Sequence, residues 1–134
     1  MRRLRSLAAL ALVAGCATAG RTEVPASLDR DFRLDRGETA VVGTDGLTVR
    51  FITVVEDSRC PLGVQCIRAG EAKVQLEVRA PGAGTDHLVL ATEGGQPRYA
   101  SFRAYDIHLV ELEPRHRTDD PHPPYVATLR VSRH

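Results

Sequence analysis

Apolar and polar residues alternate along most of the chain after residue 30, and this pattern predicts β-strands. The clearest run is residues 71–79, where every even-numbered residue is apolar and every odd-numbered residue is polar or charged. A helix would spread these apolar side chains around its circumference, whereas a half-buried antiparallel strand needs this period of two. Residues 47–55 predict a second long strand. Both of its faces are apolar toward the end, as in a central strand of a sheet.

Shorter segments with the same alternation complete the pattern. The apolar phase reverses between Leu109 and Val110, which predicts a β-bulge, because one extra residue reverses the face that a side chain meets. Seven or eight strands, with turns about every ten residues and no helical pattern in the domain, predict an all-β antiparallel β-sandwich. A small closed β-barrel is the alternative. The shorter strands are expected near residues 32–35, 39–42, 88–90, 99–102, 105–112 and 125–131.

The N-terminal residues predict export. Residues 1–15 have the layout of a signal peptide: basic residues, a short apolar run and then small residues. Val13-Ala14-Gly15-Cys16 resembles a bacterial lipobox, which implies cleavage before Cys16 and lipid on its sulfur and its new amino group. An ordinary signal peptide with cleavage further on is the alternative. Residues 16–29 lack periodicity and predict a flexible, lipid-anchored tether, so that residues 30–134 form a single all-β domain.

Charge and localisation limit the classes of partner. Removal of Arg2, Arg3 and Arg5 with the signal peptide reduces the 18 basic residues to 15 against 17 acidic ones, a charge of about −2. No basic stripe is present, so nucleic acid is not an expected partner. Lipid on Cys16 would anchor the protein in the bacterial cell envelope. Ala17 occupies the position where aspartate would favour the inner membrane, so we expect the outer membrane, with the domain facing the periplasm.

The three cysteines predict one disulfide. With Cys16 lipidated, Cys60 and Cys66 are left for each other, and an oxidising periplasm favours their pairing. A zinc site would need about four ligands, and a redox site usually has two residues between its cysteines. Here five residues intervene and no histidine is near, so a structural disulfide is the better interpretation.

The segment from Asp57 to Ala72, DSRCPLGVQCIRAGEA, is similar to the signature of a family of small, functionally uncharacterised bacterial lipoproteins. Its members carry D-S-R-C-P-x-x-V-x-C-x-x-A-G followed by a strand, and residues 105–114 and 125–131 fit the usual ending. The resemblance implies the envelope location and the fold, and no known activity. Members often have Trp where this chain has Arg68.

Two interpretations of the charged residues around the cysteines remain open. In the first, Asp57 or Ser58 accepts backbone N–H bonds in a turn, and Arg59 pairs locally with Glu56 or Asp57. In the second, Arg59 and Arg68 form an anion-binding pair on a rigid loop, so that Asp57, Arg59 and Arg68 contact a ligand or partner.

Residues 115–124 contain a second cluster of side chains that commonly bind metals. A metal site there would use His116, Asp119, Asp120 and His122, but a proline-rich exposed loop does not hold ligands rigidly, so no metal and no cofactor is expected. There is no Gly-x-Ser-x-Gly motif, and no enzyme activity is expected.

The sequence therefore predicts a lipid-anchored envelope protein with a non-catalytic β domain that acts as a binding or structural module. Its partner would be another envelope protein or a small ligand. The alternative is an inhibitor of an envelope or host enzyme, with residues 115–124 as the inhibitory loop. A metal-binding protein or an enzyme is the third hypothesis.

Overall fold

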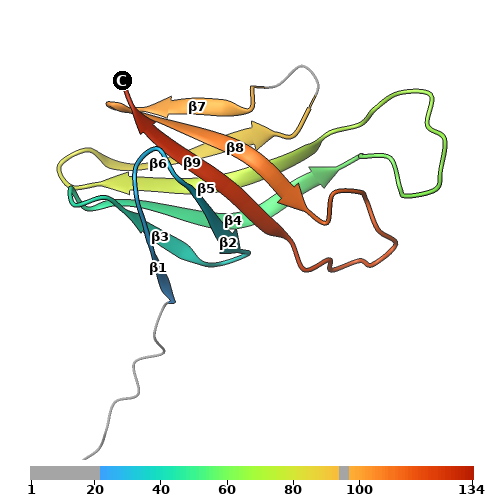
Figure 1. The fold of residues 1–134 in the computed structure, drawn as a ribbon, viewed down its shortest axis with the longest axis horizontal. Coiled ribbons are helices and arrows are strands. Elements are labelled where there is room, and N and C mark those ends of the chain that lie inside the picture. The colour runs from blue at the N-terminus through green and yellow to red at the C-terminus, as the bar shows by residue number, and fades with distance from the viewer. Residues whose placement is uncertain (1–21, 94–96) are drawn as a thin grey trace, which may run out of the picture.

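The computed structural model describes residues 22–93 and 97–134, which contain nine strands and no helix (Figure 1). The strands form two sheets that face each other and do not close into a barrel, so the predicted β-sandwich is confirmed. One sheet has the order β1-β3-β4-β5-β6 and the other β2-β9-β8-β7. The five-stranded sheet contains β1 (Glu23–Ala26), β3 (Thr39–Val42), β4 (Leu47–Asp57), β5 (Ala72–Ala80) and β6 (Gly84–Ala91). The four-stranded sheet contains β2 (Asp31–Asp35), β7 (Tyr99–Phe102), β8 (Tyr105–Glu113) and β9 (Val126–Arg133).

The alternation in the sequence is visible in the core. All four apolar residues of β5 from Ala72 to Val78 are fully buried, and the residues between them are half-buried on the outer face. The inner faces of the two sheets meet through side chains such as Phe51, Leu76 and Leu129, each completely shielded from solvent. The aliphatic character of this core agrees with a chain that has three Phe and no Trp.

The start of the domain differs from the prediction. Residues 16–29 were expected to form a tether, but Glu23–Ala26 form β1, which pairs in parallel with β3. The Asp29 amide then donates to the Val131 carbonyl at 2.8 Å. The tether prediction is wrong for residues 23–29. Backbone hydrogen bonds to β3 at the edge of the sheet order this segment. Such pairing does not require apolar and polar side chains to alternate.

The predicted signal peptide at residues 1–15, Cys16 and the start of the tether lie outside the described residues. All nine strands and the buried core lie between Glu23 and Arg133, so the chain from residue 17 onward contains the complete sandwich. Nowhere in residues 22–93 or 97–134 is there a helix with the length and hydropathy to cross a membrane.

Two β-bulges in β4 determine which side chains face the core. The register with β5 shifts once between Phe51 and Thr53 and again between Val54 and Glu56. Strict alternation from Phe51 would bury Val55, but after the first bulge Val54 packs against the core and Val55 is 52% exposed. Because the second bulge restores the original phase, Asp57 lies opposite the buried Ala72 and faces inward. The bulge predicted in β8 is confirmed by a register shift between Leu109 and Glu111.

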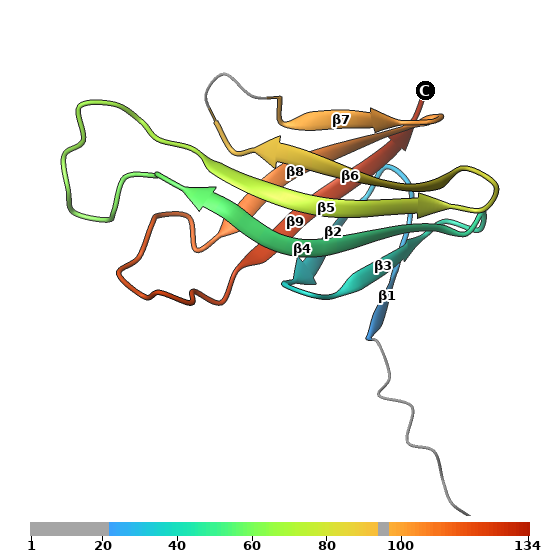
Figure 2. The ribbon, with the colours of Figure 1, turned by 180° about the vertical axis from the view of Figure 1, so that it is seen from behind.

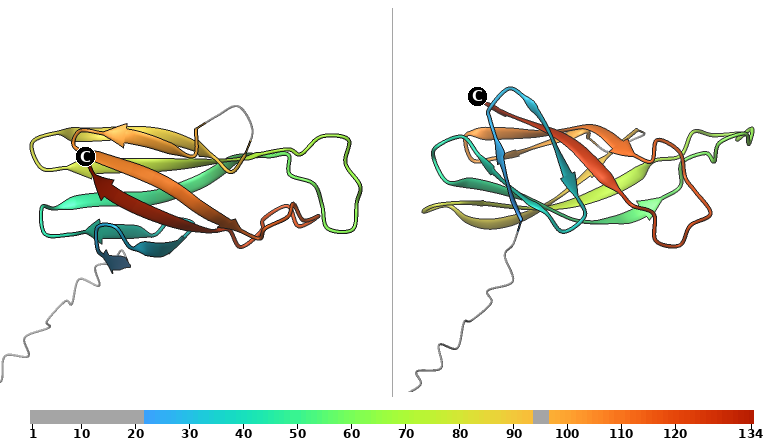
Figure 3. Two further views of the ribbon diagram at one scale, coloured as in Figure 1. Left: turned by 45° about the horizontal axis from the view of Figure 1, so that its top comes forward. Right: turned by 60° about the horizontal axis from the view of Figure 1, so that its bottom comes forward.

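The segment between β4 and β5 is the most prominent irregular feature. Residues 58–71 extend beyond the ends of both strands and away from the body of the sandwich (Figures 2 and 3). They contain the Cys60–Cys66 disulfide. We call residues 58–71 the stapled loop. The loop after β8, residues 114–125, lies beside its base and contacts it through a parallel bridge between Pro61 and Arg117.

Candidate functional site

The disulfide in the stapled loop is present as predicted. The Cα atoms of Cys60 and Cys66 lie 6.0 Å apart, and the Cys60 Sγ also approaches the Val64 carbonyl at 3.0 Å. A loop this short restricts the unfolded chain only modestly, so the chain-entropy estimate for the disulfide is about 2–2.5 kcal/mol. Within the folded protein, its main consequence is that the middle of the loop is held as a closed ring.

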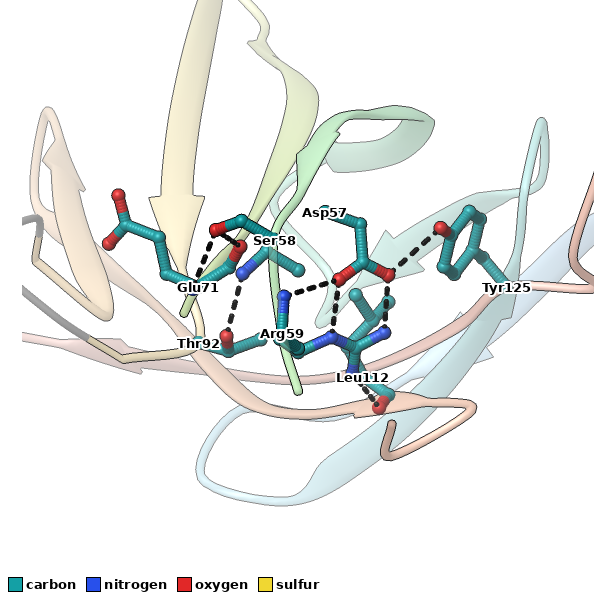
Figure 4. A network of polar contacts seen from close by, with 8 residues as sticks. Asp57, Ser58, Arg59, Glu71, Thr92, Leu112 and Tyr125 are labelled. Carbon is teal, nitrogen blue, oxygen red and sulfur yellow. Dashed lines mark hydrogen bonds and ion pairs between the residues drawn. The ribbon is translucent and has the colours of Figure 1, made fainter. Parts of the chain in front are cut away.

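A buried ion pair fixes the start of the stapled loop. The Arg59 guanidinium donates to Asp57 through both Nε and Nη2, at 2.9 and 2.8 Å (Figure 4). Both side chains are about nine-tenths buried. The Arg59 backbone N–H and the Tyr125 hydroxyl, at 3.2 and 3.0 Å, donate the other two hydrogen bonds to the carboxylate. Four donors fill the lone-pair positions of a carboxylate, so the charge of Asp57 is fully satisfied. We call Asp57, Arg59 and Tyr125 the Asp57 cluster.

The Asp57 cluster joins the two sheets at the loop end of the sandwich. Asp57 is the last residue of β4 in one sheet, whereas Tyr125 precedes β9 in the other. The remaining Nη1 of Arg59 donates to the Leu112 carbonyl of β8 at 3.2 Å. Arg59 therefore connects the stapled loop to both sheets. The first interpretation of the sequence, in which Arg59 pairs locally with Glu56 or Asp57, is confirmed for Asp57.

The ion pair also determines how Asp57 and Tyr125 titrate. Burial alone would raise the pKa of the Asp57 carboxyl, but the hydrogen bonds and charge of Arg59, with the Tyr125 hydroxyl, bring it below its usual value. Burial raises the pKa of Tyr125, and its hydrogen bond to the Asp57 carboxylate raises it further. Because the folded pKa of Asp57 is lowered, the carboxylate stabilises the fold above its unfolded pKa, near 3.9. This contribution is lost as the pH falls through the folded value.

The substitution Tyr125→Phe tests this coupling. It removes one charge-assisted hydrogen bond from Asp57 and is expected to cost about 1.5 kcal/mol of unfolding free energy at neutral pH. The loss should shrink as the pH falls through the lowered folded pKa of Asp57, and it can be measured by urea denaturation over a series of decreasing pH values. Tyr99→Phe is the matched control, since Tyr99 is 51% exposed. If the loss stays constant while the fold loses the stabilisation from the Asp57 carboxylate, the hydroxyl does not act through the carboxylate.

The two ends of the stapled loop are held together by a second set of bonds. The Ser58 N–H donates to the Glu71 carbonyl at 2.9 Å, and the Glu71 N–H donates to the Ser58 hydroxyl at 3.1 Å. The Thr92 hydroxyl accepts from the Ala72 N–H at 3.0 Å (Figure 4). Gly70 is required here, because a Cβ at that position would lie 1.7 Å from the Ser58 carbonyl oxygen. The base of the loop is thus a tightly packed neck.

Beyond this neck, the stapled loop exposes aliphatic side chains. Leu62 is 79% exposed, Val64 is 56% exposed and Ile67 is fully exposed. Single exposed apolar residues are common on protein surfaces, but three on one projecting loop indicate an interaction surface. We call Leu62, Val64 and Ile67 the aliphatic tip. The aliphatic tip was not predicted from the sequence, although three aliphatic residues in a segment without strand alternation are a visible signal.

The predicted pair of Arg59 and Arg68 is not supported by the geometry. Arg59 is buried and its guanidinium is committed to Asp57 and Leu112, whereas Arg68 is exposed. A cleft of about 400 Å³ lies at the base of the stapled loop. Its lining includes Arg59, Arg98 and Arg115 but not Arg68, and Arg115 forms an ion pair with Glu111.

The ligand-type residues after β8 are exposed side chains on a loop. His116, Asp119, Asp120 and His122 all face solvent, and the His122 N–H donates to the Asp120 carboxylate at 2.8 Å. In the described part of the chain, no three side chains of His, Cys, Asp or Glu are grouped so that they could hold a metal ion.

Comparison with known proteins adds no assignment. The chain matches no protein-family model, no curated protein and no solved structure. A functional proposal must therefore be argued from the geometry of the stapled loop and its surroundings.

Proposed function

We propose that this chain is a lipid-anchored protein of the bacterial cell envelope whose β domain binds a partner protein through the aliphatic tip of the stapled loop. The exposure of Leu62, Val64 and Ile67 on a loop fixed by a disulfide and a buried ion pair carries this proposal. Burial of such a side chain contributes about 1.5–3 kcal/mol. A loop that is already ordered loses little conformational entropy on binding, so most of this free energy contributes to affinity.

The position of the stapled loop favours a protein partner over the membrane that holds the anchor. Lipid on Cys16 would be seven residues before Glu23, the first residue of β1. Glu23 of β1 pairs with Thr39 of β3, and Thr39 in turn pairs with Arg50 of β4. Arg50 is seven residues before Asp57, the residue at which β4 ends and the stapled loop begins. This span corresponds to about 20 Å, to which the projection of the loop is added. The start of β1 is therefore separated from the stapled loop by this length of β4 (Figure 1).

Site-specific photocrosslinking tests the proposal. A photoreactive residue at position 67 of the lipidated protein, in intact envelopes, is expected to give one discrete protein adduct. The matched control is position 89, because Val89 is also an exposed aliphatic residue, 44% exposed, but lies on β6 outside the loop. Ile67→Asp should abolish the adduct formed from position 62 without changing the unfolding free energy. Equal labelling at positions 67 and 89, or labelling of lipid alone, would overturn the proposal.

The anchor is tested separately by Cys16→Ser. The wild-type chain is expected to fractionate with membranes and the variant with soluble periplasmic proteins. Membrane retention of the variant would contradict lipidation at Cys16, while the crosslinking result would still report on the aliphatic tip.

Inhibition of an enzyme is the second candidate function, and the stapled loop favours it. A rigid projecting loop can occupy an enzyme's substrate cleft, and the Cys60–Cys66 ring gives this loop that form. The predicted inhibitory loop at residues 115–124 instead lies against the base of the stapled loop through the Pro61–Arg117 bridge. If the crosslinked partner is an enzyme, wild-type domain should reduce its activity and the Ile67→Asp variant should not.

A further inference from the structure

The outer face of the five-stranded sheet has a polar depression at the end remote from the stapled loop. Its volume is about 650 Å³. Two guanidinium groups, of Arg50 on β4 and Arg79 on β5, line it together with the hydroxyl-bearing residues Thr39, Thr48 and Thr85. The depression is bounded by the turns at the start of β4 and the end of β5, so it is separated from the Asp57 cluster by most of the length of both strands.

The two arginines have no partner within the described residues. Neither guanidinium group takes part in an ion pair or donates a side-chain hydrogen bond in residues 22–93 and 97–134. The Nε atom of Arg50 is buried without any acceptor. Glu77 lies opposite Arg50 in the register, but its carboxylate is instead 3.5 Å from the His87 ring. The donors of both guanidinium groups are therefore available to an acceptor from outside the chain, and the buried Nε of Arg50 has none within the described residues.

The register brings the two arginines onto neighbouring strands. Arg50 is opposite Glu77 and Thr48 is opposite Arg79, so the arginines are diagonal neighbours on one face of the sheet. Guanidinium groups match the oxygens of phosphate in geometry and charge, and one phosphate can accept from two of them. Thr48 and Thr85 flank Arg79 on the strands beside it and can donate further hydrogen bonds to the same group.

The chain that leads to the proposed anchor enters beside this depression. Glu23, at the start of β1, is itself part of the lining. The seven residue steps from Cys16 to Glu23 can span at most about 25 Å. A membrane that holds lipid on Cys16 is therefore within reach of Arg50 and Arg79. The carboxylates of Glu23 and Glu77 in the same depression would accept hydrogen bonds from the carbon-bound hydroxyls of a polyol headgroup.

We propose that Arg50 and Arg79 bind the phosphate of an anionic phospholipid headgroup with free hydroxyls, and so orient the outer face of the five-stranded sheet toward the membrane. The choice of a lipid over free phosphate rests on the proposed anchoring at Cys16. The domain without its signal peptide carries a charge of about −2, so general attraction to an anionic surface does not account for such binding.

Vesicle cosedimentation of residues 17–134, which contain the complete sandwich and lack the lipid, tests the proposal. The probes are vesicles of phosphatidylcholine with one quarter phosphatidylglycerol, vesicles of phosphatidylcholine alone, and inorganic phosphate. We expect binding to the anionic vesicles only. The double variant Arg50→Gln/Arg79→Gln should weaken it by about tenfold or more, since each basic side chain near an anionic surface contributes roughly fivefold. Arg68→Gln/Arg117→Gln is the matched control, because it removes two charges from the loop end and should leave binding unchanged.

Three results would overturn the proposal. The first is equal binding to both vesicle types, and the second is an equal loss in the two double variants. The third is a shift of the Arg50 Nε–H resonance by inorganic phosphate without any vesicle binding, which would assign the site to a free anion. Thermal unfolding shows whether each variant remains folded. Because the assay uses neither Cys16 nor a protein partner, its failure is distinguishable from a failure of anchoring or of crosslinking at position 67.

Discussion

Arg59→Ala is expected to destabilise the domain by about 3–5 kcal/mol, the usual cost of removing one partner from a buried ion pair. The variant leaves the Asp57 carboxylate about nine-tenths buried with only the Tyr125 hydroxyl and a backbone N–H as donors. It also removes the hydrogen bond to the Leu112 carbonyl, through which the stapled loop contacts the second sheet. Chemical denaturation followed by circular dichroism at neutral pH measures the change.

An exposed ion pair provides the control for this experiment. Arg133 pairs with Asp45 and lies over the Tyr105 ring, but both charged side chains are about half exposed. Arg133→Ala should therefore cost much less unfolding free energy than Arg59→Ala, because solvent screens the exposed pair. Adding Asp57→Asn to Arg59→Ala should recover part of the loss, because a neutral amide is less costly to bury than an unpaired charge. A loss for Arg59→Ala no larger than that for Arg133→Ala would mean that the Asp57 cluster does not hold the sheets together.

The strands were predictable from the sequence because most of them bury one face. Residues 71–79 need only the period of two, and the reversal at Val110 is a local signal of a bulge. β1 gave no such signal, because it is held by backbone pairing with β3 and its side chains are largely exposed or half-buried. The two bulges in β4 were missed for a related reason. Each bulge shifts by one residue which side chains of β4 face the core, and the second bulge cancels the shift made by the first. The residues that face the core at the two ends of β4 therefore follow one continuous alternation.

The candidate site was predictable only in its local part. The disulfide and a local pairing of Arg59 could be predicted from the sequence, because both contacts join residues that are close in the chain. The sequence could not indicate that Tyr125 donates to Asp57, because that contact crosses 68 residues and depends on how the sheets face each other. The unpartnered arginines on the outer sheet face were hidden for the same reason: the register places Glu77 opposite Arg50, and only the side-chain geometry shows that its carboxylate approaches His87 instead.

Gly70→Ala is expected to open the neck of the stapled loop and to destabilise the domain by about 2–3 kcal/mol, in the upper part of the usual range for overpacking. The added Cβ would meet the Ser58 carbonyl oxygen at 1.7 Å and its carbon at 2.3 Å, and neither is a flexible side-chain atom. The backbone must therefore move, and the hydrogen bonds between Ser58 and Glu71 should break. Amide hydrogen exchange at residues 58 and 71 reports this directly.

Gly63→Ala in the same loop separates the neck from the ring. Gly63 has a positive φ of 77° and no atom within 4 Å of an added Cβ, so its substitution strains one residue by about 1–2 kcal/mol without a clash. Exchange at residues 58 and 71 should stay slow in this variant. Since the neck orients the aliphatic tip, Gly70→Ala should also reduce crosslinking from position 67, although no contact residue has been changed. If Gly70→Ala loses crosslinking while amide exchange at residues 58 and 71 stays slow, the neck does not orient the aliphatic tip. The tip would then depend on Gly70 without any opening of the neck.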